Sequence, residues 1–286
     1  MTVTTPSSYP LGRTRTAEVD LRHGDCIDVL RTLPAGSVDS VVTSPPYAMQ
    51  RKSTYGGVPE KDYPEWTVAW MREVWRVLKD DGSVIINISP HIKNGELSDY
   101  VLRTRLALRE DGWTELDELV WHKTDAMPTG SPSRPRRSWE SLLWFGKHGR
   151  AFSDAKAGGK PPLFQRPVGS IGGRADRLGW DHSMSGSKSI PKIARVPNVA
   201  VMGKAKRATV DHPAMFPWQL AEWCGKLITP PGGTILDPFT GSSSTGVAAI
   251  KNGWNFIGID QSAEYIEMSE RRLNAELAKA AEKENK

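Results

Sequence analysis

The residues best suited to chemistry stand in a short loop, Thr-Ser-Pro-Pro-Tyr at 43–47, which directly follows an apolar run of strand length. Pro45 and Pro46 stiffen the loop and carry no N–H donor, which leaves their carbonyl oxygens available to accept hydrogen bonds from an amine. Ser44 adds a hydroxyl group, and Tyr47 adds an aromatic face on which a planar ring can stack. The loop therefore predicts a small, acceptor-rich pocket for an aromatic amine.

A second group of functional residues lies near the C-terminus, where 234–246 predicts a strand, a loop of small residues and the start of a helix. Such a loop lets a ligand approach the backbone and offers helix N–H groups to an anionic group. It lacks the lysine of a phosphate-binding P-loop and is not a clean GxGxxG. Asp260 follows Asp237 by 23 residues at the end of the next predicted strand, where nucleotide-binding α/β folds hold ribose hydroxyls. A nucleotide-type cofactor site is predicted; on these residues alone, a purely structural strand–turn–helix stays open.

The rest of the chain must position these two loops. Apolar runs and helical spacing alternate along it. They predict strands at 18–23, 38–43, 83–88, 115–121, 140–145, 234–236 and 255–259, and helices at 26–33, 66–78, 97–110, 217–228, 245–252 and from 263 onward. Strands that alternate with helices at both ends of the chain are typical of a doubly wound, mostly parallel α/β sheet.

Positive charge is concentrated in the middle of the chain. The net charge of the 286 residues is +5, but 134–207 holds 16 Lys and Arg against four acids, which leaves +12 there and −7 elsewhere. Such segregation favours a polyanionic partner, although a solvated basic loop stays open as an alternative. Residues 155–195 are also rich in Gly, Ser and Pro, as in a loop that becomes ordered on a nucleic acid.

The composition excludes several classes of protein. No apolar run approaches the roughly 18 residues of a membrane helix, so we expect no membrane contact. Residues 1–17 are polar, which favours a flexible tail over a secretory signal. Cys26 and Cys224 form no CxxC pair, which favours a reducing cytoplasm, and the six histidines lack zinc-type spacing, so no metal is predicted.

In their order and spacing, the two loops resemble the motifs of the beta-group DNA amino-methyltransferases, which use S-adenosylmethionine to methylate an exocyclic base nitrogen. Further similar segments are His-Gly-Asp at 23–25, Val-Trp-His-Lys at 120–123, Trp-Glu at 139–140, Phe-Gly-Lys at 145–147 and Asp-His-Pro-Ala-Met-Phe-Pro at 211–217. One departure is the cofactor loop, which usually reads Gly-Ser-Gly-Thr in this family and reads Gly-Ser-Ser-Ser-Thr here at 241–245. Serine adopts glycine-type backbone angles less easily, so the departure bears on cofactor affinity rather than on the fold.

The resemblance implies a fold and a domain organisation. The fold is α/β, a doubly wound, mostly parallel, Rossmann-like methyltransferase sheet with circularly permuted motif order and an inserted basic target-recognition segment. We expect a flexible tail at 1–17, the catalytic half at 18–150, the target-recognition segment at 151–207, the cofactor-binding half at 208–275 and a charged tail at 276–286.

The resemblance also implies a mechanism in which the target base flips out of the duplex into the pocket. Tyr47 would stack on that base, while Ser44 and the Pro45 carbonyl would accept from its amino group. Asp237 would bind the methionine end of the cofactor, Asp260 the ribose and Asp25 the adenine. The remaining assignments are Pro46 in the catalytic loop; Pro238, Phe239, Gly241 and Ser242 in the cofactor loop; and Trp121, Lys123, Arg134, Arg136, Arg137, Arg166, Arg174, Arg177 and Lys188 on DNA.

Serine at position 44 favours N4 of cytosine in double-stranded DNA as the target, because the N6-adenine enzymes of the family more often carry aspartate there. Methylation of adenine N6, a non-catalytic DNA-binding module and a nicotinamide oxidoreductase are the alternatives. Neither cysteine follows a proline, as a cytosine-C5 enzyme requires, and no PCxxC of a base deaminase is present. A cognate restriction endonuclease is a candidate partner, and the cytoplasm of a prokaryotic or phage-infected cell, close to the nucleoid, is the expected location.

Overall fold

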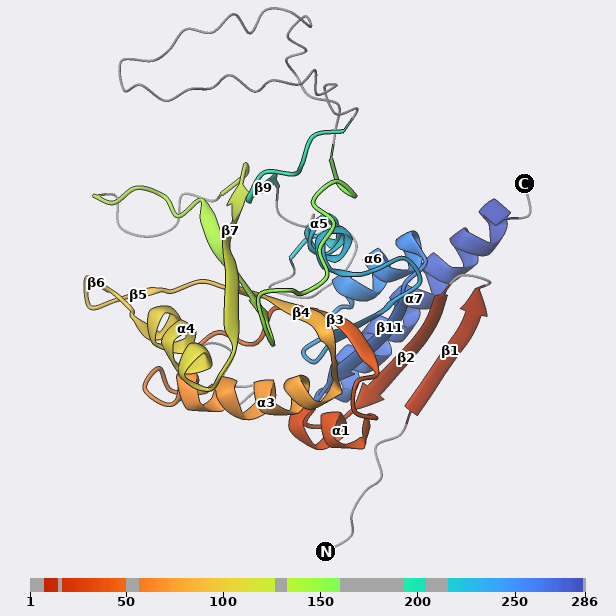
Figure 1. Ribbon diagram of the computed structural model, residues 1–286, viewed down its shortest axis with the longest axis horizontal. Helices are drawn as coiled ribbons and strands as arrows, with labels where there is room; N and C mark the ends of the chain where they lie inside the picture. Colours follow the sequence, from red (N-terminus) through yellow and green to blue (C-terminus); the bar gives the residue numbers. More distant parts are fainter. Residues whose placement is uncertain are drawn as a thin grey trace, which may run out of the picture.

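One large sheet runs through the protein, and a computed structural model describes it over residues 8–14, 17–49, 57–126, 133–159, 193–203 and 216–284 (Figure 1). Within these residues the order of the strands is β1-β2-β11-β10-β3-β4-β8-β7-β9. The strands are β1 (Ser8–Thr14), β2 (Ala17–His23), β3 (Val38–Thr43), β4 (Leu78–Ile88), β7 (Thr114–Lys123), β8 (Trp139–Gly146), β9 (Val199–Met202), β10 (Thr234–Asp237) and β11 (Asn255–Asp260), with a separate hairpin of β5 (Ile92–Lys93) and β6 (Glu96–Leu97). The helices are α1 (Cys26–Thr32), α3 (Tyr63–Val77), α4 (Tyr100–Glu110), α5 (Trp218–Ile228), α6 (Ser244–Asn252) and α7 (Ala263–Glu284).

The central strands are parallel, which decides where the functional loops lie. β2, β11, β10, β3 and β4 pair in parallel, so their carboxyl ends share one edge of the sheet. β8 is antiparallel to both β4 and β7, so β8 begins and β7 ends at that same edge. The predicted α/β fold with a mostly parallel sheet is confirmed. Ligand sites in such sheets lie beyond the carboxyl ends of the strands.

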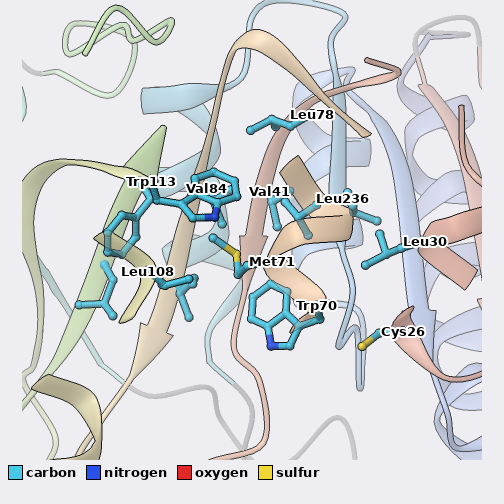
Figure 2. Packing of buried hydrophobic residues seen from close by; sticks show 14 of the residues in the cluster. Cys26, Leu30, Val41, Trp70, Met71, Leu78, Val84, Leu108, Trp113 and Leu236 are labelled. Atoms are coloured by element: carbon cyan, nitrogen blue, oxygen red, sulfur yellow. The ribbon is translucent and has the colours of Figure 1, made fainter. Parts of the chain in front are cut away.

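Alternating side chains along the strands build two hydrophobic cores, one on each face of the sheet. Val41 packs under α1, α3 and α4, whereas its neighbour Val42 packs under α5, α6 and α7. Figure 2 shows the first core, in which Trp70 and Met71 of α3 belong to the same cluster as strand residues such as Leu236. Each such large apolar side chain contributes about 2 kcal/mol when buried, which holds the helices on the sheet. The sheet is therefore covered on both faces, as the doubly wound prediction requires.

The helix boundaries follow from local chemistry. The Asp25 side chain accepts from the backbone N–H groups of Ile27 (2.9 Å) and Asp28 (3.4 Å) and so caps α1. Pro64 lies in the first turn of α3, where its missing N–H needs no intrahelical partner. None of the helices among the described residues combines the length and apolar character needed to cross a membrane.

Three differences from the sequence prediction affect the expected tails and the target-recognition segment. Residues 8–14, predicted in a flexible tail, form β1, which pairs antiparallel with β2. Residues 276–284, predicted in a charged tail, continue α7. β9 lies within the predicted target-recognition segment but pairs in parallel with β7 in the main sheet. Both ends of that segment are thus anchored to the main fold, since the Phe152 N–H donates to the Asp81 carbonyl of β4 (2.7 Å) and the Asp154 N–H to the Leu227 carbonyl of α5 (2.8 Å).

Candidate active site

The two predicted functional loops meet at the carboxyl edge of the sheet. The predicted catalytic loop, residues 44–47, follows β3, and the predicted cofactor loop, residues 238–243, follows the adjacent strand β10. The Thr43 hydroxyl donates to Asp237 Oδ1 at 2.7 Å, which joins residues that are 194 positions apart. The next strands contribute too, because the Gly24 N–H donates to the Asp260 carbonyl at 3.0 Å. The fold therefore brings the two loops together.

Asp237 is the hydrogen-bonding centre of this junction. Its side chain is 1% exposed and accepts from the hydroxyls of Thr43 and Thr245 (2.8 Å) and from the Phe239 N–H (3.1 Å). Burial raises its pKa from 3.8 to about 6, although these three hydrogen bonds favour the charged form. The resemblance assigns Asp237 to the methionine end of the cofactor; in the structure its carboxylate ties the catalytic loop, the cofactor loop and α6 to one another.

Asp260 shapes the cofactor loop from the neighbouring strand. Its Oδ2 accepts from the Gly241 N–H and its Oδ1 from the Ser262 N–H, both at 2.9 Å. Ser243 has a left-handed backbone (φ 56°), whereas Ser244 is already the first residue of α6. The departure from the family loop therefore strains Ser243 and not Ser244. The Ser243 hydroxyl lies 2.8 Å from that of Thr240, a hydrogen bond that offsets part of the strain.

Helix α7 holds the same loop from outside. Ser269 donates to the Gly241 carbonyl (2.7 Å), and Arg272 donates to the Ser242 carbonyl (2.6 Å) and hydroxyl (3.2 Å). Burial lowers the pKa of the Arg272 guanidinium, and the nearby Glu276 opposes this shift. Sequence reasoning missed both residues, because helical spacing predicts which face of α7 is buried but not which backbone carbonyls it meets.

Aromatic side chains support the other side of the cofactor loop. Phe239 is half-buried, with its ring centroid 5.2 Å from that of Trp70 and 5.5 Å from that of Trp66 on α3. Pro238 before it is buried. Asp25 is exposed, and its carboxylate caps α1 at the end of β2. Asp25, Asp237 and Asp260 thus place three carboxyl groups at one edge of the sheet, and such hydrogen-bond acceptors suit a ligand with positive charge and hydroxyl groups.

The catalytic loop contacts the end of the β7–β8 hairpin. The Tyr47 hydroxyl donates to Glu140 Oε2 at 2.9 Å and lies 3.3 Å from Asn87 Oδ1. Burial and the Glu140 carboxylate raise the pKa of Tyr47 well above its ordinary value, while a hydrogen bond from the Ser44 hydroxyl opposes them. Lys123 forms an ion pair with Glu140. Tyr47 is therefore a neutral donor whose ring is fixed by its hydroxyl.

The predicted DNA-binding residues lie in different environments. Trp121 is 3% exposed and its indole N–H donates to the Met202 carbonyl of β9 (3.1 Å), so in this structure its side chain packs within the sheet rather than on the surface. Lys123 is engaged with Glu140, and its ammonium lies 5.1 Å from the centre of the Trp121 ring. Arg134 and Arg136 are exposed, and Arg137 is half-buried. Four predicted residues lie outside the described part of the chain: Arg166, Arg174, Arg177 and Lys188.

Glu140 was noted in the sequence only as part of the family-like segment at 139–140, and Asn87 was not noted at all; the structure brings both to Tyr47. The hairpin that carries Glu140 was recognised as a unit, but its contact with a loop more than 90 residues earlier depends on the sheet order. Among the described residues, no group of three or more His, Cys, Asp and Glu could hold a metal ion.

Comparisons with known proteins agree with this arrangement. The family model described as DNA methylase, which covers N6 and N4 methyltransferases, matches residues 38–271. The Type II methyltransferase M.XycI of Xanthomonas campestris pv. cyanopsidis is 30% identical, over 90% of this chain and 88% of its own length. M.PvuII of Proteus hauseri is 26% identical, over 87% of this chain and 82% of its own length.

Solved structures show the same fold. The PvuII DNA methyltransferase, described as cytosine-N4-specific, superposes with a TM-score of 0.67 and 22% identity and covers 93% of each chain. A DNA modification methylase of Thermus thermophilus in complex with S-adenosylmethionine gives a TM-score of 0.59 at 22% identity, over 90% of this chain and 95% of the other. With a family match over most of its length and both functional loops at one edge of the sheet, the chain belongs to the DNA methylase family of N6 and N4 amino-methyltransferases.

Proposed function

We propose that this protein transfers a methyl group from S-adenosylmethionine to N4 of cytosine at a specific sequence in double-stranded DNA. The observation that carries the proposal is the position of Ser44, directly after β3 and three residues before Tyr47. The Thr43–Asp237 hydrogen bond of 2.7 Å holds this loop against the cofactor loop. A hydroxyl and a carbonyl can orient an amine for in-line attack, so catalysis rests mainly on positioning.

The cofactor is S-adenosylmethionine, which supplies an electrophilic methyl group on a positively charged sulfur. The residues around the cofactor loop fit it chemically, since three carboxyl groups lie at this edge of the sheet, the exposed Asp25 and the buried Asp237 and Asp260, and the ring of Phe239 offers an apolar wall. Asp25 would hold the adenine and Asp260 the ribose, while Asp237 sets the position of the loop and the sign of the local charge.

Two observations support cytosine over adenine. The first is the serine hydroxyl at position 44, where the resemblance associates aspartate with adenine enzymes. The second is the likeness to the PvuII enzyme, named as cytosine-N4-specific, both in sequence and in fold. Because relatives of this chain are Type II methyltransferases, we also propose that it protects DNA against a restriction endonuclease with the same recognition sequence.

Target recognition is assigned to the basic middle of the chain. Exposed Arg134 and Arg136 precede β8, whose first residues lie at the edge of the sheet that carries the catalytic loop. Lysine and arginine side chains that neutralise phosphates release counterions, so DNA binding should weaken strongly with rising salt.

Mass spectrometry of nucleosides tests the proposal directly. DNA from a methylation-deficient bacterial host that expresses the chain should contain N4-methylcytosine, and DNA from cells that express Ser44→Ala should not. N6-methyladenine instead would contradict the choice of base. If the protein is folded and binds S-adenosylmethionine but the host DNA contains neither methylated base, the proposed activity is contradicted.

A further inference from the structure

The peptide bond between Ser242 and Ser243 is held at both of its polar atoms. Its carbonyl oxygen accepts from Nη1 of Arg272 on α7 at 2.6 Å, and its N–H group donates to the Thr240 carbonyl at 2.7 Å. On the other side of Ser243, the carbonyl of this residue accepts from the Val247 N–H of α6 at 3.0 Å. Both peptide planes that flank Ser243 are therefore fixed.

These fixed planes keep Ser243 in a conformation that its side chain disfavours. Its φ of 56° and ψ of 47° lie in the left-handed region, at the N-cap position of α6. For a residue with a Cβ atom, this region carries a penalty of about 5- to 30-fold in a conformational equilibrium. Such a residue stays there only where its surroundings impose the geometry. Gly241 has a similar φ of 50° without that penalty, because it is glycine.

Arg272 lies where it can impose this geometry from outside the loop. Its Nη1 also donates to the hydroxyls of Ser242 (3.2 Å) and Ser244 (3.4 Å), so it contacts the residues on both sides of Ser243. Because the peptide after Ser243 belongs to α6, relaxation to a negative φ rotates the 242–243 peptide and breaks its bonds to Arg272 and Thr240. The buried Ser243 hydroxyl adds a further restraint, 2.8 Å from that of Thr240.

We propose that Arg272 is a positioning residue for the cofactor, which holds Ser243 in the left-handed conformation that a glycine at this position would adopt unaided. The inference rests on the assignment of residues 238–243 to S-adenosylmethionine, in which the loop and the start of α6 offer their backbone to the cofactor. A loop that already has the bound shape binds its ligand more tightly than a loop that must first reach it. In this role Arg272 acts through the loop and not through contact with the cofactor.

Calorimetric titration of the DNA-free protein with S-adenosylmethionine tests this role. Arg272→Met keeps an unbranched apolar stem but removes every donor, so the dissociation constant should rise by about 5- to 30-fold, the factor set by the left-handed penalty. Ser243→Gly removes that penalty, and in the Arg272→Met background it should recover most of the lost affinity. Ser243→Ala keeps the penalty and loses the hydroxyl contact, so in the same background it should recover none.

The matched control is Arg271→Met, at the exposed neighbouring position of α7, which should bind S-adenosylmethionine as wild type does. Urea unfolding establishes that each variant is folded at the temperature of the titration. If Arg272→Met is unfolded, Arg272→Lys with and without Ser243→Gly gives the same comparison, because the lysine side chain is one bond shorter and reaches the Ser242 carbonyl less well.

Two results refute the positioning role of Arg272. One is an unchanged dissociation constant in the folded Arg272 variant. The other is a loss of affinity that Ser243→Gly does not recover, or that Ser243→Ala recovers equally well. Wild-type protein that does not bind S-adenosylmethionine refutes the assignment of the cofactor loop instead.

Discussion

Replacing Asp237 by asparagine should change how the stability of the protein depends on pH. Burial raises the pKa of this carboxyl from 3.8 to about 6, so the folded state binds its proton more tightly than the unfolded state does. The stabilisation from this group is therefore fully present below pH 3.8 and is lost as the pH rises through about 6. The full effect of a shift of this size is about 3 kcal/mol, of which about 1.4 kcal/mol falls between pH 5 and pH 8.

The substitution suits the site, because asparagine can keep most of the hydrogen bonds. Its Oδ1 can still accept from Thr43 and from the Phe239 N–H. The Thr245 hydroxyl already lies 3.3 Å from the Val42 carbonyl and can donate there while it accepts from the new amide. The variant therefore removes the titration and keeps these contacts. The second amide N–H gains no partner, but that cost does not depend on pH and cancels when the two pH values are compared.

The measurement is urea unfolding of wild type and Asp237→Asn at pH 5 and pH 8, followed by tryptophan fluorescence. Other titrating groups cancel in the difference between the two proteins. As the pH rises from 5 to 8, the unfolding free energy of wild type should fall by about 1.4 kcal/mol relative to that of the variant. Asp28→Asn, on the exposed surface of α1, serves as the control. A difference that does not change with pH would refute the assignment of a buried, proton-binding carboxyl at this junction.

Three further predictions follow from the site. Ser44→Ala should abolish methylation and leave S-adenosylmethionine affinity intact; loss of cofactor binding would contradict its role. A short Gly-Ser linker can replace residues 160–192, because a hydrogen bond from the Val196 N–H to the Ala155 carbonyl (2.8 Å) holds the flanking residues together. In a filter-binding assay this variant should bind DNA more weakly, while its binding of the cofactor persists. Unchanged DNA affinity would contradict the assignment of target recognition to this segment. Trp121→Phe should lower the unfolding free energy by about 1–2 kcal/mol, because a buried hydrogen bond is lost, and should leave DNA affinity unchanged. Weaker DNA binding by this variant would instead indicate that Trp121 contacts DNA directly.

Local patterns predicted the elements that build the parallel core. Apolar runs identified β3 and β10, and their ends identified the two loops, because a parallel sheet has only one carboxyl edge. β1 and β9 were missed for a physical reason. Both are edge strands whose partners come from long-range pairing, and β9 is a four-residue strand in a polar, basic neighbourhood.

The candidate site was predicted in its residues more than in its contacts. Asp237 and Asp260 were identified by spacing, but their hydrogen bonds to Thr43 and Gly241 depend on which strands are neighbours. Glu140 shows the same limit, since nothing near it in the sequence indicates a contact with Tyr47. Trp121 shows the reverse, because its place in the family-like segment at 120–123 suggested a role at the DNA, while the parallel strand β9 covers it.

The strand order also determines when the protein can first become active during synthesis. β2 and β3 are made first but do not pair with each other, because β10 and β11, from the last third of the chain, lie between them. Until those two strands arrive, the N-terminal part exposes unpaired strand edges, which are prone to aggregation. During synthesis, β10 and β11 can therefore pair between β2 and β3 only after those strands have been made, and this pairing also creates the Thr43–Asp237 junction. A chain interrupted before β10 would therefore lack not only its cofactor loop but also the centre of its sheet.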